Sequence, residues 1–147
     1  MNISFWYDHG VYSIKDAMVE SLISLGHTVT SYWPDADVSV DYPDFAHPVA
    51  GDILSGKSDR GILMCGTWNG MAMTANKHPG IRAWLAWSPE IARLMRFHND
   101  AQILCLPARF LSVPDILECI RVFLSTEFEG GRHCARIEKI KVIRDEM

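Results

Sequence analysis

The sequence predicts an α/β protein, a three-layer sandwich in which helices cover both faces of a five-stranded parallel sheet. Three observations support this fold class. Short β-rich runs alternate with helix-like runs along the chain, as they do in βαβ units. The β-rich runs are apolar along nearly their whole length, which is typical of parallel strands covered on both faces. The connections between runs are short, so each helix can return to the sheet by a right-handed crossover.

The five expected strands each combine β-branched, aromatic and other apolar residues. They are ISFWY (3–7), TVTSYW (28–33), GILMC (61–65), RAWLA (82–86) and QILCL (102–106). Five such strands often take the flavodoxin-like order 2-1-3-4-5, and ligands then bind beyond the carboxyl ends of strands 1 and 3. We therefore expect this order and a site at that edge of the sheet.

Helical patterns separate the strands, near residues 13–25, 44–55, 68–77, 89–98 and 114–125. The fourth is the clearest, because Ser88 can cap it and Pro89 suits its first position. The fifth starts near Pro114 and carries a broad apolar face. A last helical segment, 132–145, follows EFEGGRH, and we expect it to dock on a neighbouring subunit.

Length and composition narrow the class of protein. A chain of 147 residues suits one domain, which we place at 1–147. The net charge is −4 and no basic run occurs, which argues against a nucleic-acid surface. No apolar run approaches the ~20 residues that span a bilayer. The start does not resemble a signal peptide, and the four cysteines form no C-x-x-C pair, so we expect reduced thiols in a cytoplasmic protein.

Two polar stretches would meet at the expected site, YDHG (7–10) after strand 1 and CGTWNG (65–70) after strand 3. Cys65 would lie near a helix N-terminus, which favours its thiolate as a base or nucleophile. The alternative is an inert cysteine at the end of a buried strand. The backbone N–H groups of residues 66–70 could surround an oxyanion or a phosphate.

Other polar side chains have two interpretations each. Asp8 and His9 either cap a turn or act on a ligand. His98 shares an apolar helical stripe, so it is either a core residue or an acid in the HND sequence that closes the helix. Arg132 and Arg136 are four residues apart, so they form either a phosphate clamp or a solvated face. Nothing resembles a metal-ligand spacing. A thiol base, an imidazole acid, an oxyanion site and a phosphate clamp suit proton abstraction beside a carbonyl in a sugar phosphate.

Six separated motifs carry a family resemblance over nearly the whole chain. They are DHG (8–10), SVDYPDFA (39–46), DRGILMCGT (59–67), ANKHPGIRA (75–83), HNDAQIL (98–104) and FEGGRHCARIEKI (128–140). The chain resembles the type B ribose-5-phosphate isomerases and the galactose-6-phosphate isomerase subunits. The resemblance implies a Rossmann-like aldose–ketose isomerase of a phosphorylated sugar, as in the pentose phosphate pathway. It implies a homodimer or a dimer of dimers with shared active sites, and no metal or organic cofactor.

The resemblance also implies a role for each site residue. Cys65 would move the proton between C1 and C2 of the open-chain sugar with support from Thr67, and the backbone from Gly66 to Gly70 would stabilise the enediolate. His98 would assist ring opening from the partner subunit. The other implied contacts are Asn99 and Arg109 from the partner, Asp8 with the sugar, Tyr42 in the wall of the site, and His9, Arg132 and Arg136 with the phosphate.

One motif departs from the family pattern, which usually reads CGTGIGMS where this chain reads CGTWNGMA (65–72). Trp68 stands for a glycine and Asn69 for an aliphatic residue. An indole can bury about 150–250 Å². Either it points away and the substrate pair is ribose 5-phosphate and ribulose 5-phosphate, or it reshapes the pocket for a tetrose 4-phosphate, such as erythrulose 4-phosphate, or for a hexose 6-phosphate.

A different class of function stays open beside these. The chain could be a non-catalytic sugar-phosphate-binding member of the family, or one subunit of a hetero-oligomeric isomerase. The presence of Cys65, Thr67 and His98 argues against a non-catalytic member.

Overall fold

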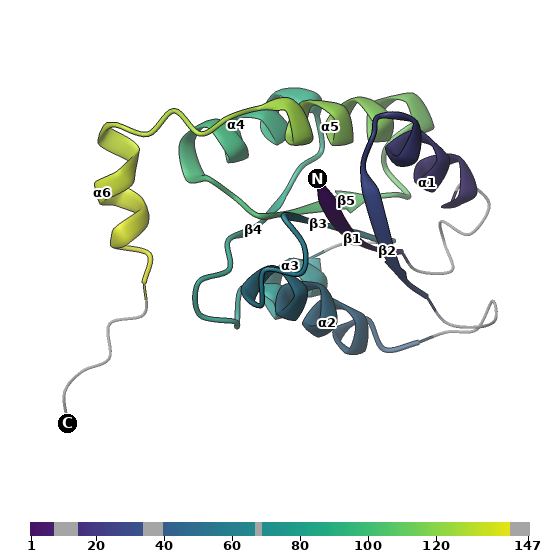
Figure 1. The fold of residues 1–147 in the computed structure, drawn as a ribbon, viewed down its shortest axis with the longest axis horizontal. Helices are drawn as coiled ribbons and strands as arrows, with labels where there is room; N and C mark the ends of the chain where they lie inside the picture. The colour runs from purple at the N-terminus through teal and green to yellow at the C-terminus, as the bar shows by residue number, and fades with distance from the viewer. Residues whose placement is uncertain (8–14, 34–39, 67–68, 142–147) are drawn as a thin grey trace.

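The computed structural model describes residues 1–7, 15–33, 40–66 and 69–141. Its centre is a parallel sheet (Figure 1). The strands are β1 (Asn2–Tyr7), β2 (Thr28–Tyr32), β3 (Arg60–Cys65), β4 (Ala83–Leu85) and β5 (Ile103–Pro107). The helices are α1 (Lys15–Ser24), α2 (Pro43–Leu54), α3 (Asn69–Ala75), α4 (Pro89–Asn99), α5 (Val113–Ser125) and α6 (Arg132–Glu138). The predicted fold class, a five-stranded parallel α/β sandwich, is confirmed.

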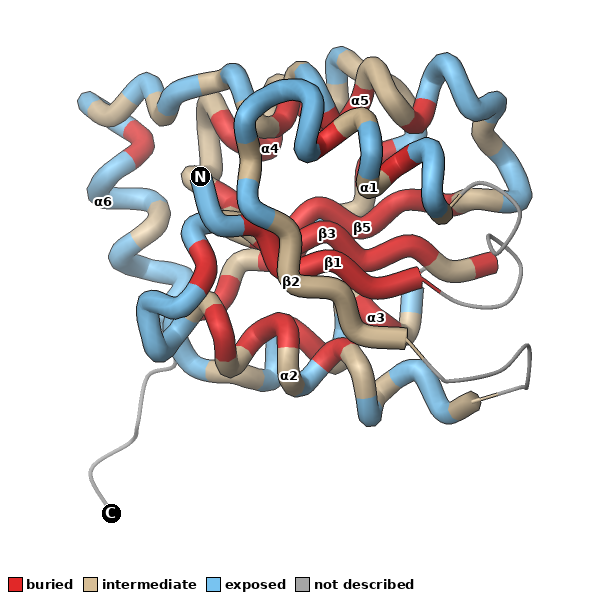
Figure 2. Tube along the Cα trace, turned by 45° about the vertical axis from the view of Figure 1, so that its right-hand side comes forward, coloured by how far each residue is buried: buried red, intermediate tan, exposed pale blue. Residues whose placement is uncertain are grey.

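Helices cover both faces of the sheet. Figure 1 shows α1, α4 and α5 on one face and α2 and α3 on the other. Side chains of β1 alternate between the two layers: Ile3 and Phe5 pack with α1, α4 and α5, whereas Trp6 packs with α2 and α3. The tube in Figure 2 shows the central strands buried. The continuous apolar character of these strands therefore reflects two cores, one on each face.

The order of the last two strands differs from our expectation. The sheet runs β2-β1-β3-β5-β4, so β5 lies beside β3 and β4 forms the edge. The flavodoxin-like order 2-1-3-4-5 was wrong at this point. The burial of the two strands gives the reason, because every residue of β5 is buried whereas Trp84 in the three-residue β4 is 46% exposed. A short strand with one exposed face suits an edge.

The helix boundaries follow the predicted signals. Ser88 accepts a hydrogen bond from the Ile91 N–H at 3.3 Å and Pro89 occupies the first turn of α4. Ser112 caps α5 in the same way. The last helix is shorter than the predicted 132–145, because α6 ends at Glu138 and residues 142–147 lie outside the described part of the chain. Among the described residues, no helix combines the length and apolar character needed to cross a membrane.

The ends of the strands define two further sides of the sheet, which we call the carboxyl edge and the amino edge. All strands are parallel, so their carboxyl ends share one edge, the carboxyl edge. Helix α4 leaves β4 at that edge and returns to the start of β5, so Asn99 lies at the opposite, amino edge. Helix α5 returns in the same direction after β5, and α6 follows it, at the left of Figure 1. Helix α6 therefore packs beside α4 at the amino edge.

Candidate active site

Cys65 is the last residue of β3 and lies at the carboxyl edge, as predicted. Its carbonyl accepts a hydrogen bond from the Ala108 N–H at 3.2 Å. Its half-buried side chain packs beside the core cluster that contains Trp6 and Leu63. The thiol therefore sits where the sheet ends and the polar connection to α3 begins.

Arg109 lies directly against Gly66. A Cβ added to Gly66 would be 2.9 Å from Nε and 3.1 Å from Cζ of Arg109, so the guanidinium occupies the space that a side chain would need. The pairing of β3 with β5 produces this contact, because Cys65 is level with Pro107 and Arg109 follows two residues later. The family resemblance implies that Arg109 serves the partner's site, yet here its side chain meets the cysteine segment of its own chain.

Tyr42, the residue just before α2, lies at the same edge of the sheet. A Cβ added to Gly70 would lie 2.4 Å from Cζ and 2.5 Å from the hydroxyl of Tyr42, so the phenol rests on the first turn of α3. Asn69, which begins α3, is exposed beside it. Six predicted site residues thus come together at the carboxyl edge: Cys65, Gly66, Asn69, Gly70, Tyr42 and Arg109.

The buried cysteines are poor candidates for a base. Burial, and to a smaller extent the nearby Cys65, raises the pKa of the Cys105 thiol far above its ordinary value. Burial likewise raises the pKa of Cys119 to about 11, helped by Asp115 and Glu118. Both thiols stay protonated at neutral pH. The remaining described cysteine, Cys134, is exposed on α6 at the other end of the molecule.

Four predicted site residues, Asp8, His9, Thr67 and Trp68, lie outside the described residues. Their roles stay predictions. The described residues that precede them in the chain lie at the carboxyl edge, because Tyr7 ends β1 and Gly66 follows the end of β3.

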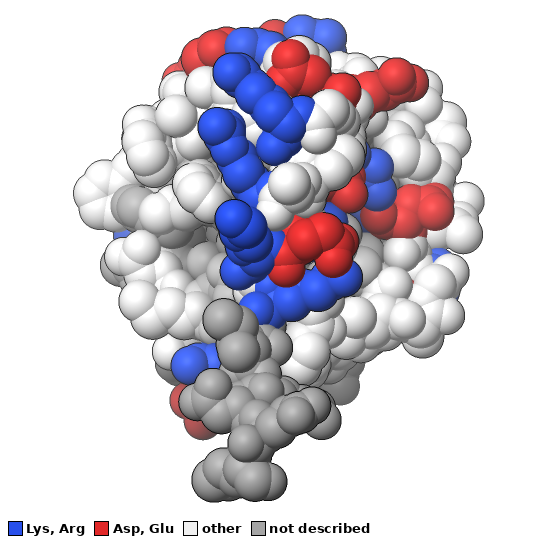
Figure 3. Space-filling model, turned by 90° about the vertical axis from the view of Figure 1, so that its left-hand side faces the viewer, with Lys and Arg blue, Asp and Glu red and all other residues white. Residues whose placement is uncertain are grey.

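The other predicted residues gather at the amino edge. His98 and Asn99 form the last turn of α4, and Arg132 and Arg136 lie on α6. The His98 ring stacks on that of His133, with centroids 4.5 Å and planes 18° apart. Both arginines of α6 are exposed, and Lys and Arg side chains gather in a column on the face that Figure 3 shows. This edge therefore offers imidazole and guanidinium groups together.

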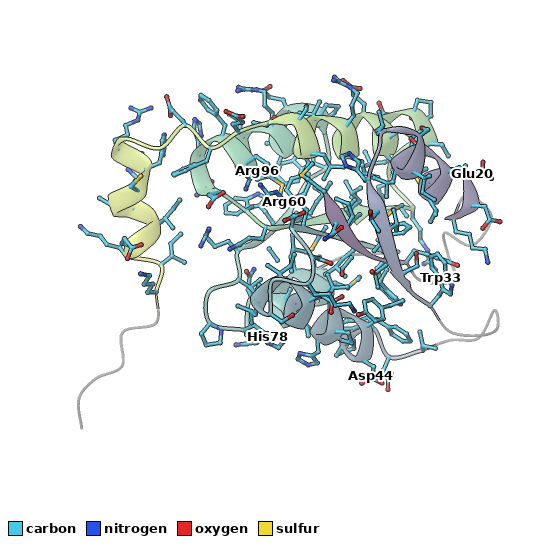
Figure 4. The ribbon with its side chains drawn as sticks, viewed as in Figure 1. Glu20, Trp33, Asp44, Arg60, His78 and Arg96 are labelled. Atoms are coloured by element: carbon cyan, nitrogen blue, oxygen red, sulfur yellow. The ribbon has the colours of Figure 1, made fainter. Side chains whose placement is uncertain are left out.

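The carboxylate of the HND sequence is already engaged. Asp100 accepts from Arg96 Nη1 at 2.7 Å and from Arg82 Nη2 at 3.0 Å. Arg82 also donates through Nε to the carbonyl of Asn99 at 2.8 Å. Figure 4 labels Arg96 close to Arg60, another cation of this edge, and burial, followed by the charge of Arg96, lowers the pKa of Arg60. Asp100 thus holds the end of α4 in place rather than serving as a free acid or base.

Sequence reasoning missed the residues that support His98. His133 is buried, and its Nε2 lies 2.9 Å from Oε2 of Glu129. Glu129 and His133 are four residues apart, but the break between α5 and α6 hides this relation from helical periodicity. The roles of Arg82 and Arg96 could not be predicted either, because the two side chains meet at Asp100 only in the folded chain.

Known proteins resemble this chain in sequence and fold. A family model for ribose/galactose isomerases matches residues 3–140. A putative sugar phosphate isomerase of Bacillus subtilis is 42% identical, over 95% of each chain. A D-erythrulose-4-phosphate isomerase of Pectobacterium atrosepticum is 38% identical, over 95% of this chain and 93% of its own. The crystal structure of a ribose 5-phosphate isomerase of Thermotoga maritima superposes with a TM-score of 0.90 and 43% identity, over 95% of this chain and 97% of that one.

The family model covers nearly the whole chain, and relatives of similar length match it at well above 30% identity. The expected class of protein, an isomerase of phosphorylated sugars, is confirmed. The chain belongs to the ribose/galactose isomerase family.

Proposed function

We propose that this isomerase interconverts an aldose phosphate and its ketose by moving a proton between C1 and C2, with Cys65 as the base. The observation that carries the proposal is the position of Cys65 at the carboxyl edge, followed by Gly66 with the Arg109 guanidinium against it. The thiolate removes the proton beside the carbonyl, a cis-enediolate forms, and the same group returns the proton to the neighbouring carbon. Arg109 supplies positive charge next to the developing oxyanion.

The active site forms between two copies of the chain. Cys65, Tyr42 and Arg109 lie at one edge of the sheet, and His98 and Arg136 at the other. One chain cannot bring these edges together, but a two-fold dimer can place the amino edge of one copy on the carboxyl edge of the other. His98 then opens the sugar ring, and Arg132 and Arg136, which share the amino edge with it, bind the phosphate of the same substrate.

A groove at the amino edge supports this assembly. A cavity of about 600 Å³ lies between the segment 78–84 and α6. Trp84, Ile137 and Ile140 line it, and Trp84 and Ile140 are largely exposed in the single chain. An apolar groove beside Asn99 suits a second copy, because contact there would cover these side chains and complete the site at once.

The preferred substrate pair is ribose 5-phosphate and ribulose 5-phosphate, with erythrulose 4-phosphate as the rival. The Thermotoga maritima relative is named a ribose 5-phosphate isomerase, and the Pectobacterium relative is named a D-erythrulose-4-phosphate isomerase. A thiolate base also requires a reducing compartment, which favours the cytoplasm.

A panel of four-, five- and six-carbon aldose and ketose phosphates tests the proposal, assayed with the native chain and with Cys65→Ala. We expect turnover on at least one sugar and a loss of at least about 10²–10⁴-fold in the variant, the usual contribution of a positioned acid–base group. Cys119→Ala, which removes a protonated core thiol, is the control. Turnover on none of the sugars would favour a non-catalytic binding subunit, and a fully active Cys65→Ala would move the base elsewhere.

A further inference from the structure

Three side chains able to bind a metal ion meet where α4 ends and α6 begins. They are His98 in the last turn of α4, Glu129 in the connection to α6, and His133 in the first turn of α6. One ring nitrogen from each histidine and one carboxylate oxygen all lie within 4.8 Å of one another. Two imidazoles and a carboxylate form a ligand set that zinc and related ions bind well.

The surrounding contacts hold two of these groups in position. The backbone N–H of Glu129 donates to the Phe97 carbonyl at 2.9 Å, which ties the connection to α4. The Glu129 carboxylate lies 2.9 Å from Nε2 of His133. His133 is 5% exposed, whereas Glu129 is exposed. An ion can therefore arrive from solvent on the Glu129 side and meet a histidine that is already fixed.

The spacing matches that of two ligands on one ion. Donors about 2.0–2.2 Å from Zn²⁺, at angles from 90° to tetrahedral, lie about 2.8–3.6 Å from each other. The 2.9 Å separation between Glu129 and His133 falls at the short end of this range, so both atoms can bind one ion with little movement. The His98 ring is stacked on His133 and must rotate to present its nitrogen. His98 is only half-buried, which leaves room for that rotation.

We propose that His98, Glu129 and His133 bind Zn²⁺ or a similar divalent transition-metal ion, and that the bound ion inhibits the isomerase. The inhibitory part rests on the proposed function, in which His98 opens the sugar ring. Coordination occupies the ring nitrogen through which His98 exchanges a proton in this step. The Nε atom of Arg132 lies 3.4 Å from Nε2 of His133 and must move away from the ion. Because Arg132 is also proposed to bind phosphate, zinc and the sugar phosphate should compete.

Calorimetric titration of the full chain with ZnCl₂, in a buffer free of phosphate and chelators, tests the binding. We expect one zinc ion per chain, no comparable binding of Mg²⁺, and a fall in zinc affinity of at least about tenfold in Glu129→Gln and in His133→Gln. Because His133 is buried and its variant can fail to fold, the exposed Glu129→Gln is the decisive variant. X-ray absorption of the zinc complex should count two imidazole nitrogens.

The matched control is a second histidine pair on the other side of the sheet. Nδ1 of His47 and Nε2 of His78 are 2.7 Å apart, and Figure 4 labels His78 beside α2 and α3. His47→Gln should leave the zinc affinity unchanged. The proposal is overturned if zinc does not bind, or if Glu129→Gln binds zinc as tightly as the native chain does. Loss of binding in His47→Gln would then place the ion at the His47–His78 pair.

An activity assay separates this inference from the proposed function. Zinc should inhibit the native enzyme, EDTA should reverse the inhibition, and added sugar phosphate should weaken it. Glu129→Gln, compared with its own zinc-free rate, should need at least about tenfold more zinc for half-inhibition. Zinc bound at the three residues without inhibition would refute the inhibitory role. Absence of isomerase activity on every sugar would refute the proposed function and leave the calorimetric test of the metal site valid.

Discussion

Nη1 of Arg96 lies 2.7 Å from Oδ1 of Asp100, and this ion pair fixes the end of α4 that presents His98 and Asn99. Arg96 is only 3% exposed, so its Nη1 donates to Asp100 and to the Ala101 carbonyl in place of water. Asp100 adopts a left-handed backbone conformation with φ of 45° and ends the helix. Arg82 binds the second oxygen of the same carboxylate. The geometry of the HND sequence therefore depends on two arginines outside it.

Asp100→Asn should destabilise the protein and slow the enzyme together. Asparagine tolerates the left-handed backbone, so the change removes mainly the charge that two cations share. We expect a loss of about 1–3 kcal/mol in the free energy of unfolding, because a nearly buried guanidinium loses its carboxylate, and a lower kcat, because His98 and Asn99 lose a fixed support. Urea denaturation and steady-state kinetics measure the two effects.

Glu90→Gln is the control for this variant. It breaks the exposed pair that Glu90 forms with Arg93 in the first turns of the same helix, and exposed pairs contribute little. Equal effects of Asp100→Asn and Glu90→Gln would show that Asp100 is not a support for the site.

Gly70→Ala should lower activity far more than stability. The added Cβ would lie 2.4–2.7 Å from the outer atoms of the Tyr42 ring. Because Tyr42 is exposed, its ring can swing away at small cost, but it then leaves the wall of the site. Gly51→Ala is the matched control in α2, where nothing lies within 4 Å of an added Cβ, and it should stabilise the helix by about 0.5–1 kcal/mol. Unchanged kcat/KM in Gly70→Ala would remove Tyr42 from the site.

Protonation of Asp52 should account for part of the stability that the protein loses in acid. Its carboxylate is buried on α2 and accepts hydrogen bonds from Ser4 at 2.5 Å and from Tyr32 at 2.7 Å. Burial alone would raise its pKa, but the bonds from Ser4, Tyr32 and Lys57 together lower the pKa below its ordinary value. A carboxyl whose pKa is lower in the folded state stabilises the fold fully above its unfolded pKa. This contribution fades as the pH falls through the folded value.

Asp52→Ala should therefore lose about 1–3 kcal/mol at pH 7, the cost of leaving buried hydrogen-bonding groups without a partner. The difference from the native chain should narrow progressively below about pH 4. Lys57→Gln is the control, because the Lys57 ammonium is half-exposed and its loss should matter much less. Denaturation curves from pH 7 to pH 2.5 measure both variants. A difference that stays constant with pH would contradict the role of the Asp52 charge.

The layers of the fold could be predicted because each central strand is apolar on both faces and each helix on one. The order of β4 and β5 could not, because both strands are short and apolar and only their packing separates them. β4 is three residues long, which leaves too little sequence pattern to mark it as an edge strand. The early end of α6 was also unpredictable, since the charged pattern of residues 132–141 continues past Glu138.

Candidate site residues could be predicted from the sequence only where the residues that form the local pattern are neighbours in the chain. The position of Cys65 at the carboxyl edge could be predicted because a strand end and a small-residue turn adjoin in the sequence. The support of His98 by His133 and that of Asn99 by Arg82 join segments that are 35 and 17 residues apart, and no local pattern records them. The resemblance grouped Arg109 with His98 and Asn99 of the partner, whereas the fold places Arg109 against Gly66 and Arg136 on α6, at the opposite edge of the sheet.

Trp68→Gly tests how this chain departs from its family. If the indole bounds the sugar pocket, its removal should shift relative kcat/KM toward longer sugar phosphates by about 1–3 kcal/mol, the range that a hydrophobic pocket discriminates. The same four-, five- and six-carbon panel measures the shift. Trp87→Gly, which removes an exposed tryptophan before α4, should leave the substrate ranking unchanged. An unchanged ranking in Trp68→Gly would make ribose 5-phosphate the better candidate.

Mixing inactive variants tests whether two chains build each site. In a dimer of Cys65→Ala and His98→Asn subunits, one site combines both lesions and the other combines two intact edges. Random exchange of equal amounts makes half of the dimers mixed, so about a quarter of the native activity should return.

Cys65→Ala mixed with Arg136→Ala should recover likewise, because Arg136 shares the amino edge with His98. Arg109 lies against Gly66 of its own chain, so Cys65→Ala mixed with Arg109→Ala should recover nothing. Mass spectrometry of differently tagged subunits verifies the exchange. Recovery with Arg109→Ala would place that arginine in the partner's site, and no recovery with His98→Asn would put both reacting groups in one chain.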